Sequence, residues 1–434
     1  MSMVMLSTFG VILALVALSF LSFKGFHPVV VGLLASAIVA LSGGQNLLDS
    51  ILKSYVPGIA AFFVSNFIIF FFSALLGKIY EETGAAKTVA EKLSSLFGPK
   101  LAMMAVCLST AALIYGGITS FVVIFAIYPI ALVLFEKADI PDYLIPGVVC
   151  LGLWSFAMTG PASTQIQNIM PMNALGTGSL AGGAAGVIGA LCMFAFGIIY
   201  MMWMERRARA AGQHFVFPSH VQRFEDTRAR PSIIPALIPL VFVILVFNVF
   251  KWNINVALFV SVILSVALFF KYFPKGQLIK TFNQGAAGAV TIIINTAAIV
   301  GFGSVVKSVP FFEKAVEFLA KSNLHPYLVS LTTANGLAGI MGSSSGSIAL
   351  TLSTLDTTIA QWGTQGFNLG YIHRLISVGG GGLDSLPHCG AIISVLAVCG
   401  LTHKQAYFPI FVNCTVIPIL VSYCIMLPIM ILMG

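Results

Sequence analysis

The sequence has few charged residues for its length. Asp, Glu, Lys and Arg make up 8% of the 434 residues, whereas a soluble globular protein contains roughly a quarter. Hydrophobic residues make up 58%, so a soluble protein is excluded and the chain is expected to lie in a lipid bilayer. At about 20 residues per crossing helix, the chain has room for about 10 to 12 membrane segments. This excludes a single-span receptor and a surface-bound enzyme.

The sequence also lacks the residue clusters that bind metals. Its seven cysteines all lie in apolar stretches, with no C-x-x-C pair and no Cys/His cluster, so we expect them to be small packing residues. We expect no metal and no cofactor. The first 23 residues lack the basic start of a secretory signal and are expected to be a retained first span.

Several apolar runs are too short to cross a membrane. Residues 101–114 would form a helix of about 21 Å, whereas the hydrocarbon core is roughly 30 Å thick. Such short runs occur in adjacent pairs and predict re-entrant hairpins.

The same order of features occurs twice. A shift of 226 residues aligns Gly77 with Gly303, Gly116 with Gly342 and Pro161 with Pro387. We therefore predict an all-α membrane protein of two inverted-topology repeats, each with five crossing helices, one re-entrant hairpin and one broken helix. The predicted repeats are 1–204 and 232–434, joined by a linker at 205–231.

The linker predicts the orientation of the chain. Residues 205–230 carry six Arg against three acidic residues, which places them in the cytoplasm by the positive-inside rule. Five crossings on either side then put both termini outside. We interpret the net charge of +8 mostly as this orientation signal, with an anionic-lipid site as the alternative for the basic run, and expect no nucleic-acid partner.

The tip of each predicted hairpin is rich in small and hydroxyl residues. A Gly-Gly tip lets two short helices end at one point, where backbone N–H groups and hydroxyls are free to bind an anion. The alternative is that small residues ease helix packing. The candidate substrate-binding residues at the two tips are Tyr115, Gly116, Gly117, Thr119, Ser120, Gly342, Ser343, Ser344 and Ser345.

A proline-interrupted helix follows each hairpin. In the first half, residues 159–168 surround Pro161, and Thr164, Gln165 and Asn168 are expected to line a cavity. In the second half, residues 379–388 contain four glycines, which we expect to interrupt the helix. The half-helix that begins after each break has a positive dipole end suited to a carboxylate, and Ser385 is a candidate to contact a substrate hydroxyl.

Asp384 and His388 lie at the second break. Ionisable residues at membrane depth are functional candidates, and three roles stay open for them. They relay a proton, or they cap and satisfy backbone groups, or they contact the substrate directly. Arg374 is expected near a membrane interface, where it is solvated or attracts an anion from outside. We therefore expect no fixed buried cation in the centre.

Two other classes of protein compete with a transporter. Residues 342–346 match the G-x-S-x-G pattern of serine hydrolases, with His388 available as a base. That motif requires a strand-to-helix elbow, which an all-helical chain does not provide. An anion channel is the other alternative, although the sequence shows no charge ring or filter-like series.

Three segments resemble the gluconate permease (GntP) family of bacterial carboxylate:proton symporters, within the ion transporter superfamily. They are YGGITSFVVIFAIYPIALVLF (115–135), PASTQIQNIMP (161–171) and LDSLPHCGAIISVLAVCGLTHKQAY (383–407). The resemblance implies an inner-membrane importer of sugar acids or short hydroxy acids, with a scaffold that commonly dimerises. The break containing Leu-Pro-His is most similar to members assigned to 3-hydroxybutyrate.

The resemblance also points to particular residues. In addition to the candidates above it implicates Gln167 and Pro387, and Cys389 stands where Asn is expected. Relatives that use Na+ coordinate it with Ser-Asn-Thr tips, but this chain has Ser109 and Thr110 without the Asn, which favours protons over Na+. The expected function is import of a small hydroxy-monocarboxylate, either 3-hydroxybutyrate or a gluconate-like acid, coupled to protons through Asp384 and His388.

Overall fold

The computed structural model describes residues 2–24, 26–97, 101–118, 120–218, 229–274, 276–312, 314, 324–387 and 389–434. Within these ranges the chain forms helices and no strand. The all-α fold class is therefore confirmed for the part of the chain that the structure describes.

The first half contains the helices up to residue 210. They are α1 (Met3–Phe23), α2 (Pro28–Ser42), α3 (Leu47–Ser50), η1 (Ile51–Tyr55), α4 (Val56–Glu82), α5 (Ala85–Phe97), α6 (Ala102–Tyr115), α7 (Ser120–Ala138), η3 (Asp142–Leu144), α8 (Ile145–Ala157), α9 (Ile166–Leu175) and α10 (Gly183–Ala210).

The second half begins after the linker. Its helices are α11 (Ile233–Asn248), α12 (Ile254–Phe269), η4 (Phe270–Tyr272), α13 (Leu278–Lys307), α15 (Pro326–Met341), α16 (Ser344–Thr354), α17 (Asp356–Thr364), α18 (Leu369–Gly382), η5 (Leu383–Ser385), α19 (Gly390–Cys399), α20 (His403–Phe411), η6 (Val412–Val416), α21 (Ile417–Val421), η7 (Ser422–Met426) and α22 (Leu427–Met433).

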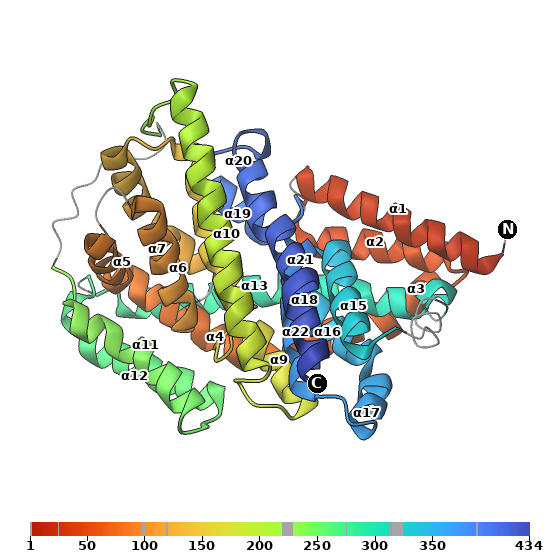
Figure 1. Cartoon of the computed structure of the whole chain (residues 1–434). Coiled ribbons are helices and arrows are strands. Elements are labelled where there is room, and N and C mark those ends of the chain that lie inside the picture. The colour runs from red at the N-terminus through yellow and green to blue at the C-terminus, as the bar shows by residue number, and fades with distance from the viewer. Residues whose placement is uncertain are drawn as a thin grey trace.

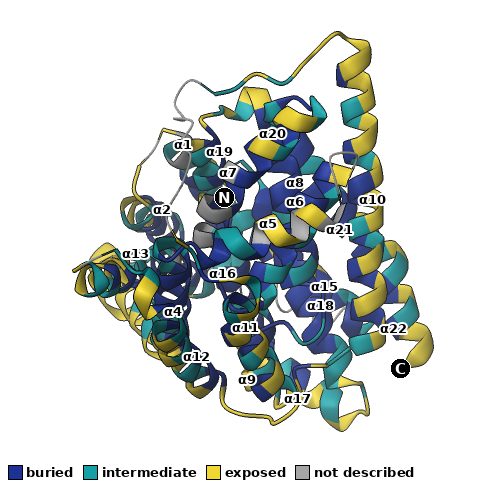
Figure 2. Cartoon of the chain, turned by 90° about the vertical axis from the view of Figure 1, so that its left-hand side faces the viewer, coloured by how far each residue is buried: buried dark blue, intermediate teal, exposed yellow. Residues whose placement is uncertain are grey.

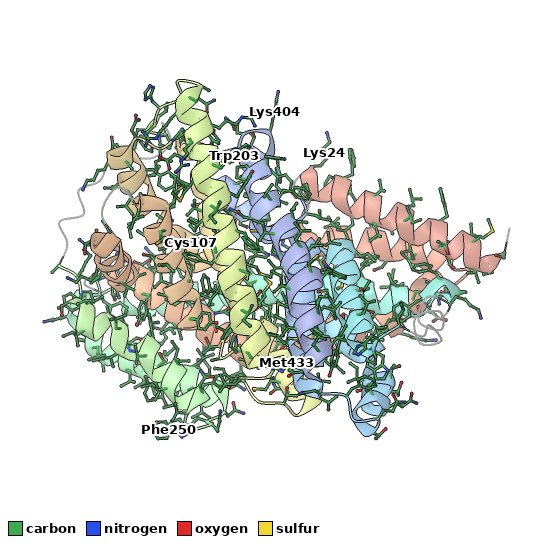
Figure 3. All side chains as sticks on the ribbon, viewed as in Figure 1. Lys24, Cys107, Trp203, Phe250, Lys404 and Met433 are labelled. Atoms are coloured by element: carbon green, nitrogen blue, oxygen red, sulfur yellow. The ribbon has the colours of Figure 1, made fainter. Side chains whose placement is uncertain are left out.

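Several helices are long and apolar enough to cross a membrane. Five segments of the described chain meet this criterion: Leu47–Glu82, Gly183–Ala210, Ile254–Tyr272, Leu278–Lys307 and His403–Met433. A sixth is added if α18 and α19, which are bent by 53°, count as one span. Large apolar side chains, among them Trp203 and Phe250, cover the outside of the molecule (Figure 3). The chain is a multi-pass membrane protein, and the number of ten crossings stays a prediction.

Four pairs of helices in the two halves begin at a constant spacing. Helices α15, α16, α18 and α19 each begin 224 residues after α6, α7, α8 and α9, respectively. This spacing is two residues from the offset that the sequence predicts. It supports an internal repeat, and the inverted orientation of the second half stays a prediction.

The packing of the helices also has a matching pattern in the two halves. Helix α4 packs along α13, α2 contacts α13, and α12 contacts α4. The pair α1 and α2 lies on one side of the molecule, and the pair α11 and α12 lies on the opposite side (Figure 1). Helix α7 contacts α19, and α16 contacts α9. The second arm of each hairpin therefore packs on the second half-helix of the other half.

The most deeply buried helices belong to the interior of this arrangement. Nearly all residues of α8 and α18 are buried, whereas α10 and α12 have exposed outer faces (Figure 2). The expectation that the four glycines of α18 interrupt the helix is wrong. Gly379–Gly382 do not interrupt the helix but form the last turn of α18.

Close packing explains why these four glycines are helical. A Cβ would lie 2.8 Å from the Leu331 carbonyl at Gly379 and 2.3 Å from Met158 Sδ at Gly381. At Gly382 it would lie 2.6 Å from Asn335 Oδ1. Tertiary packing therefore outweighs the low helix propensity of glycine, and after η5 the described residues Leu386, Pro387 and Cys389 are not helical.

The described ends of the linker are attached to helices of the first half. Asp139, just after α7, accepts hydrogen bonds from His214 Nδ1 (2.8 Å) and from the Phe215 N–H (3.1 Å). The hydrogen bond from His214 lowers the pKa of Asp139 most, and the bond from the Phe215 N–H lowers it further. Arg230 forms an ion pair with Glu91 of α5 (2.9 Å). The described ends of the linker are thus both attached to the first half.

Candidate functional site

A cavity of about 750 Å³ lies between the two halves of the chain. Residues of both hairpin tips and both helix breaks line it, together with residues of α4, α8 and α13. Its polar lining consists of His27, Ser73, Ser120, Thr164, Gln165, Gln167, Thr291, Asn295, Ser343, Ser344, Ser345, Asp384 and Ser394.

Four helices begin at this cavity. They are α7 at Ser120, α9 at Ile166, α16 at Ser344 and α19 at Gly390. The first turn of a helix has N–H groups without an intrahelical acceptor and carries the positive end of the helix dipole. A cavity that faces four such ends is suited to an anion.

The first hairpin and the first break are tied together by hydrogen bonds. Thr164 Oγ1 donates to the Tyr115 carbonyl (2.8 Å), and Gln165 Nε2 donates to the Ile114 carbonyl (2.5 Å). In return the Tyr115 hydroxyl donates to the Pro161 carbonyl (3.1 Å). These bonds satisfy carbonyl groups at the end of α6 and fix the two cavity-lining side chains of the break.

The glycines of the first tip allow close approach to the second half. A Cβ on Gly116 would lie 2.7 Å from Leu240 of α11. Gly117 has a φ of +90°, and a Cβ there would lie 3.1 Å from Leu258 of α12. Both glycines and Tyr115 therefore hold the tip in place rather than line the cavity. Thr119, at the same tip, lies outside the described residues.

The second tip contacts the first break. Gln167 Nε2 donates to Ser344 Oγ at 3.0 Å, and Ser343 caps α16 by accepting from the Gly346 N–H. Gly342 ends α15 in a left-handed conformation with a φ of +56°. The candidates Gly342–Ser345 all line the cavity.

Asp384 is a buried carboxylate in the cavity wall. Its side chain is 2% exposed and accepts a hydrogen bond from Trp154 Nε1 at 2.8 Å. Ser344 interacts with it through its hydroxyl and its backbone amide. His388 lies outside the described residues, so Asp384 is the described member of the predicted pair.

Two candidate residues lie behind the cavity wall. Asn168 is fully buried and donates through Nδ2 to the carbonyls of Ser163 (2.8 Å) and Ser179 (3.3 Å). Ser385 is also fully buried, and its hydroxyl bonds Thr415 Oγ1 (2.7 Å). The amide of Asn168 and the hydroxyl of Ser385 are therefore already used by the protein itself.

Arg374 contradicts the expectation of a solvated interface residue. It is fully buried and extends from α18 to the first break, where it donates to the Gly160 carbonyl (3.2 Å) and to Asn168 Oδ1 (2.8 Å). The expectation that no fixed cation is buried in the centre is therefore wrong. The sequence did not reveal this burial, because the partners of Arg374 are distant in sequence.

Sequence reasoning missed two other residues near Asp384 and the break. Trp154 belongs to no recognisable motif, and His373 bonds Asn168 Oδ1 from the same helix as Arg374 (3.0 Å). The one available signal was the His-Arg pair inside an otherwise apolar run of 369–378.

A multi-pass helical protein whose two halves enclose a cavity lined by apolar and polar side chains is typical of membrane transporters. Residues 2–430 match the family model described as GntP family permease. The chain belongs to this family, so it is a permease and not an enzyme.

Two curated relatives are also transporters. An uncharacterized transporter of Bacillus subtilis (strain 168), YxjC, is 31% identical to this chain, and the match covers 92% of this chain and 94% of the relative. The Gnt-II system L-idonate transporter of Escherichia coli (strain K12) is 24% identical, with 84% and 82% covered.

Proposed function

We propose that this permease is a secondary active transporter that imports a small hydroxy-monocarboxylate by proton symport. The substrates that we propose are 3-hydroxybutyrate or a gluconate-like sugar acid. The observation that carries the proposal is the convergence of four helix N-termini on one cavity, because such ends stabilise an anion without a dedicated ion pair. The similarity to an L-idonate transporter supports a sugar acid.

The proposed carboxylate site lies between the two tips. The N–H groups at the start of α9 and α16 and the hydroxyls of Ser120, Thr119 and Ser343–Ser345 bind the carboxylate. Gln165 and Gln167, which line the cavity, contact the substrate hydroxyl. Asn168 and Ser385 support this site from behind, since their polar groups are bonded within the protein.

The proposed coupling group is Asp384, with His388 as its partner. Arg374 and Asp384 are the two Lys, Arg, Asp or Glu side chains that are buried in the described part of the chain. The two side chains form no ion pair in the described structure, but their formal charges sum to zero when Asp384 is ionised. A proton that enters together with a monovalent anion keeps the net charge at zero, which avoids the cost of an uncompensated buried charge.

The proposed moving unit consists of the two hairpins and the two broken helices. The contacts of α7 with α19 and of α16 with α9 support this grouping, because they join the halves inside the unit. Helices α1, α2, α4, α11, α12 and α13 form the proposed scaffold, and a homodimer through this scaffold is expected. We place the protein in the bacterial inner membrane.

Uptake by purified protein in liposomes tests this function. A pH gradient, acidic outside, is compared with a Na+ gradient for 3-hydroxybutyrate, gluconate and L-idonate. We expect accumulation with the pH gradient alone. Accumulation with the Na+ gradient alone would favour Na+ coupling, unitary currents would favour an anion channel, and flux that ignores both gradients would disprove symport.

A further inference from the structure

The guanidinium group of Arg374 is held at the first break by neutral acceptors. Besides the Gly160 carbonyl and Asn168 Oδ1, it donates through Nε to the Ala181 carbonyl (3.0 Å). Arg374 belongs to the second half of the chain, whereas all three acceptors belong to the first half. The side chain therefore joins the two halves behind the cavity wall.

None of the ion pairs that the structure describes includes Arg374. A buried charge without a counter-charge is costly, and among the described residues its partners are two carbonyl groups and one amide oxygen. Its positive charge is therefore available to an anion nearby.

Two glycines make room for Arg374. Gly182 has a φ of +61°, and a Cβ there would lie 2.6 Å from the Arg374 Cβ. A Cβ on Gly186 would lie 3.0 Å from the Thr159 carbonyl and 3.3 Å from the Arg374 Cδ. The start of α10 thus fits closely around the arginine stem and holds its head group at the break.

The acceptor Asn168 connects Arg374 to the cavity. Asn168 belongs to the first turn of α9, directly after Gln167, which lines the cavity. Its amide orientation is fixed because Nδ2 donates to two carbonyl groups. Its Oδ1 accepts from Arg374 and from His373 Nε2. The cation therefore lies behind the helix end that faces the cavity.

We propose that Arg374 is the fixed counter-charge of the anion site. It acts from behind the first break as a positioning residue, holding the start of α9 through Asn168 and adding its positive charge to that of the helix end. This inference rests on the proposed function, because it assumes that the cargo of the cavity is an anion. The charge of Arg374 then sets the preference for a carboxylate over an uncharged analogue.

The test compares charged and uncharged ligands on the same variants. Binding of 3-hydroxybutyrate and of gluconate, each against its neutral primary amide, is measured on full-length protein in lipid nanodiscs at one pH. The variants are Arg374→Gln, which removes the charge, and Arg374→Lys, which keeps it. Lys404→Gln is the control, since Lys404 is exposed and points outward at the end of the molecule (Figure 3).

We expect Arg374→Gln to weaken carboxylate binding by roughly tenfold or more, because the attraction between opposite charges is strong in a protein interior. Amide binding should stay within about twofold, because no charge is involved. Arg374→Lys should restore most of the carboxylate preference, and Lys404→Gln should bind as the unchanged protein does.

Three results would overturn the counter-charge role. The first is an equal loss of carboxylate and amide binding in Arg374→Gln, which would show a purely structural role. The second is an unchanged carboxylate preference. The third is the failure of Arg374→Lys, when folded, to restore that preference. If the unchanged protein binds no carboxylate, both this inference and the proposed function fail; binding without gradient-driven uptake would reject symport alone.

Discussion

In the proposed mechanism, Asp384 is charged in one state of the transport cycle and protonated in another. It is buried in the cavity wall and accepts a hydrogen bond from Trp154. Asn has nearly the same shape and can still accept that bond, but it cannot bind or release a proton. The substitution Asp384→Asn therefore removes the proton-binding group but keeps the packing of the side chain.

We predict that Asp384→Asn abolishes accumulation driven by a pH gradient but preserves exchange of labelled substrate between the two sides of the membrane. Proteoliposome uptake and counterflow measure the two activities on the same preparation. Asp356→Asn is the control, because Asp356 is exposed at the start of α17. Gradient-driven accumulation by Asp384→Asn would exclude Asp384 as the coupling group.

The sequence identified some site residues but not how each is used. Ser120, Thr164, Gln165 and Ser343–Ser345 were found from local patterns, and the structure places them at the cavity. Asn168 and Ser385 have the same kind of side chain but face the protein interior. The direction of a side chain depends on long-range partners such as Arg374 and Thr415, which no local pattern reveals.

At the scale of elements, the breaks between helices supply much of the polar lining of the cavity. The sequence predicted a tip at Gly116 and Gly117 and a break within 159–168, because Gly-Gly and Gly-Pro pairs disfavour a continuous helix. The described residues 116–118 and 158–165 are indeed not helical. The same reasoning was wrong for Gly379–Gly382, which are helical. There the close approach of neighbouring helices decides the conformation.

Gly182 offers a test of the fit around the first break. Alanine at this position would adopt a left-handed conformation, which costs about 1–2 kcal/mol. Its methyl group would also overlap the Arg374 stem, since the Cβ atoms would lie 2.6 Å apart. We predict that Gly182→Ala lowers the thermal unfolding midpoint and weakens carboxylate binding.

Gly178→Ala is the matched control in the same segment, because a Cβ there meets nothing within 4 Å and its φ is not positive. Thermal unfolding in detergent and ligand binding compare the two variants. Equal stability of both would contradict the close fit between Gly182 and Arg374.

At the scale of the whole molecule, four successive helices of the first half recur in the second half at a spacing of 224 residues, from α6–α9 to α15, α16, α18 and α19. Figure 3 shows Lys24 and Lys404 at one end of the molecule and Phe250 and Met433 at the other. The proposed orientation places the first pair in the cytoplasm and the second pair outside. The side on which each terminus lies is therefore testable.

We predict that reporters fused at the C-terminus and in the linker respond in opposite ways. Alkaline phosphatase, which is active outside the inner membrane, should be active when fused after Gly434 and inactive when inserted after Gln213. A green fluorescent protein reporter at the same positions should give the reverse pattern. Activity of one reporter at both positions would reject the inverted arrangement.

The sequence by itself determined the membrane environment, the all-helical class and the family, because these depend on composition and on local patterns of apolar, glycine and proline residues. Only the tertiary structure decided that Gly379–Gly382 are helical, that Arg374 is buried at the first break, and that Asn168 supports the cavity from behind. Each of these features depends on groups that are remote in the chain and become neighbours only when the two halves pack together.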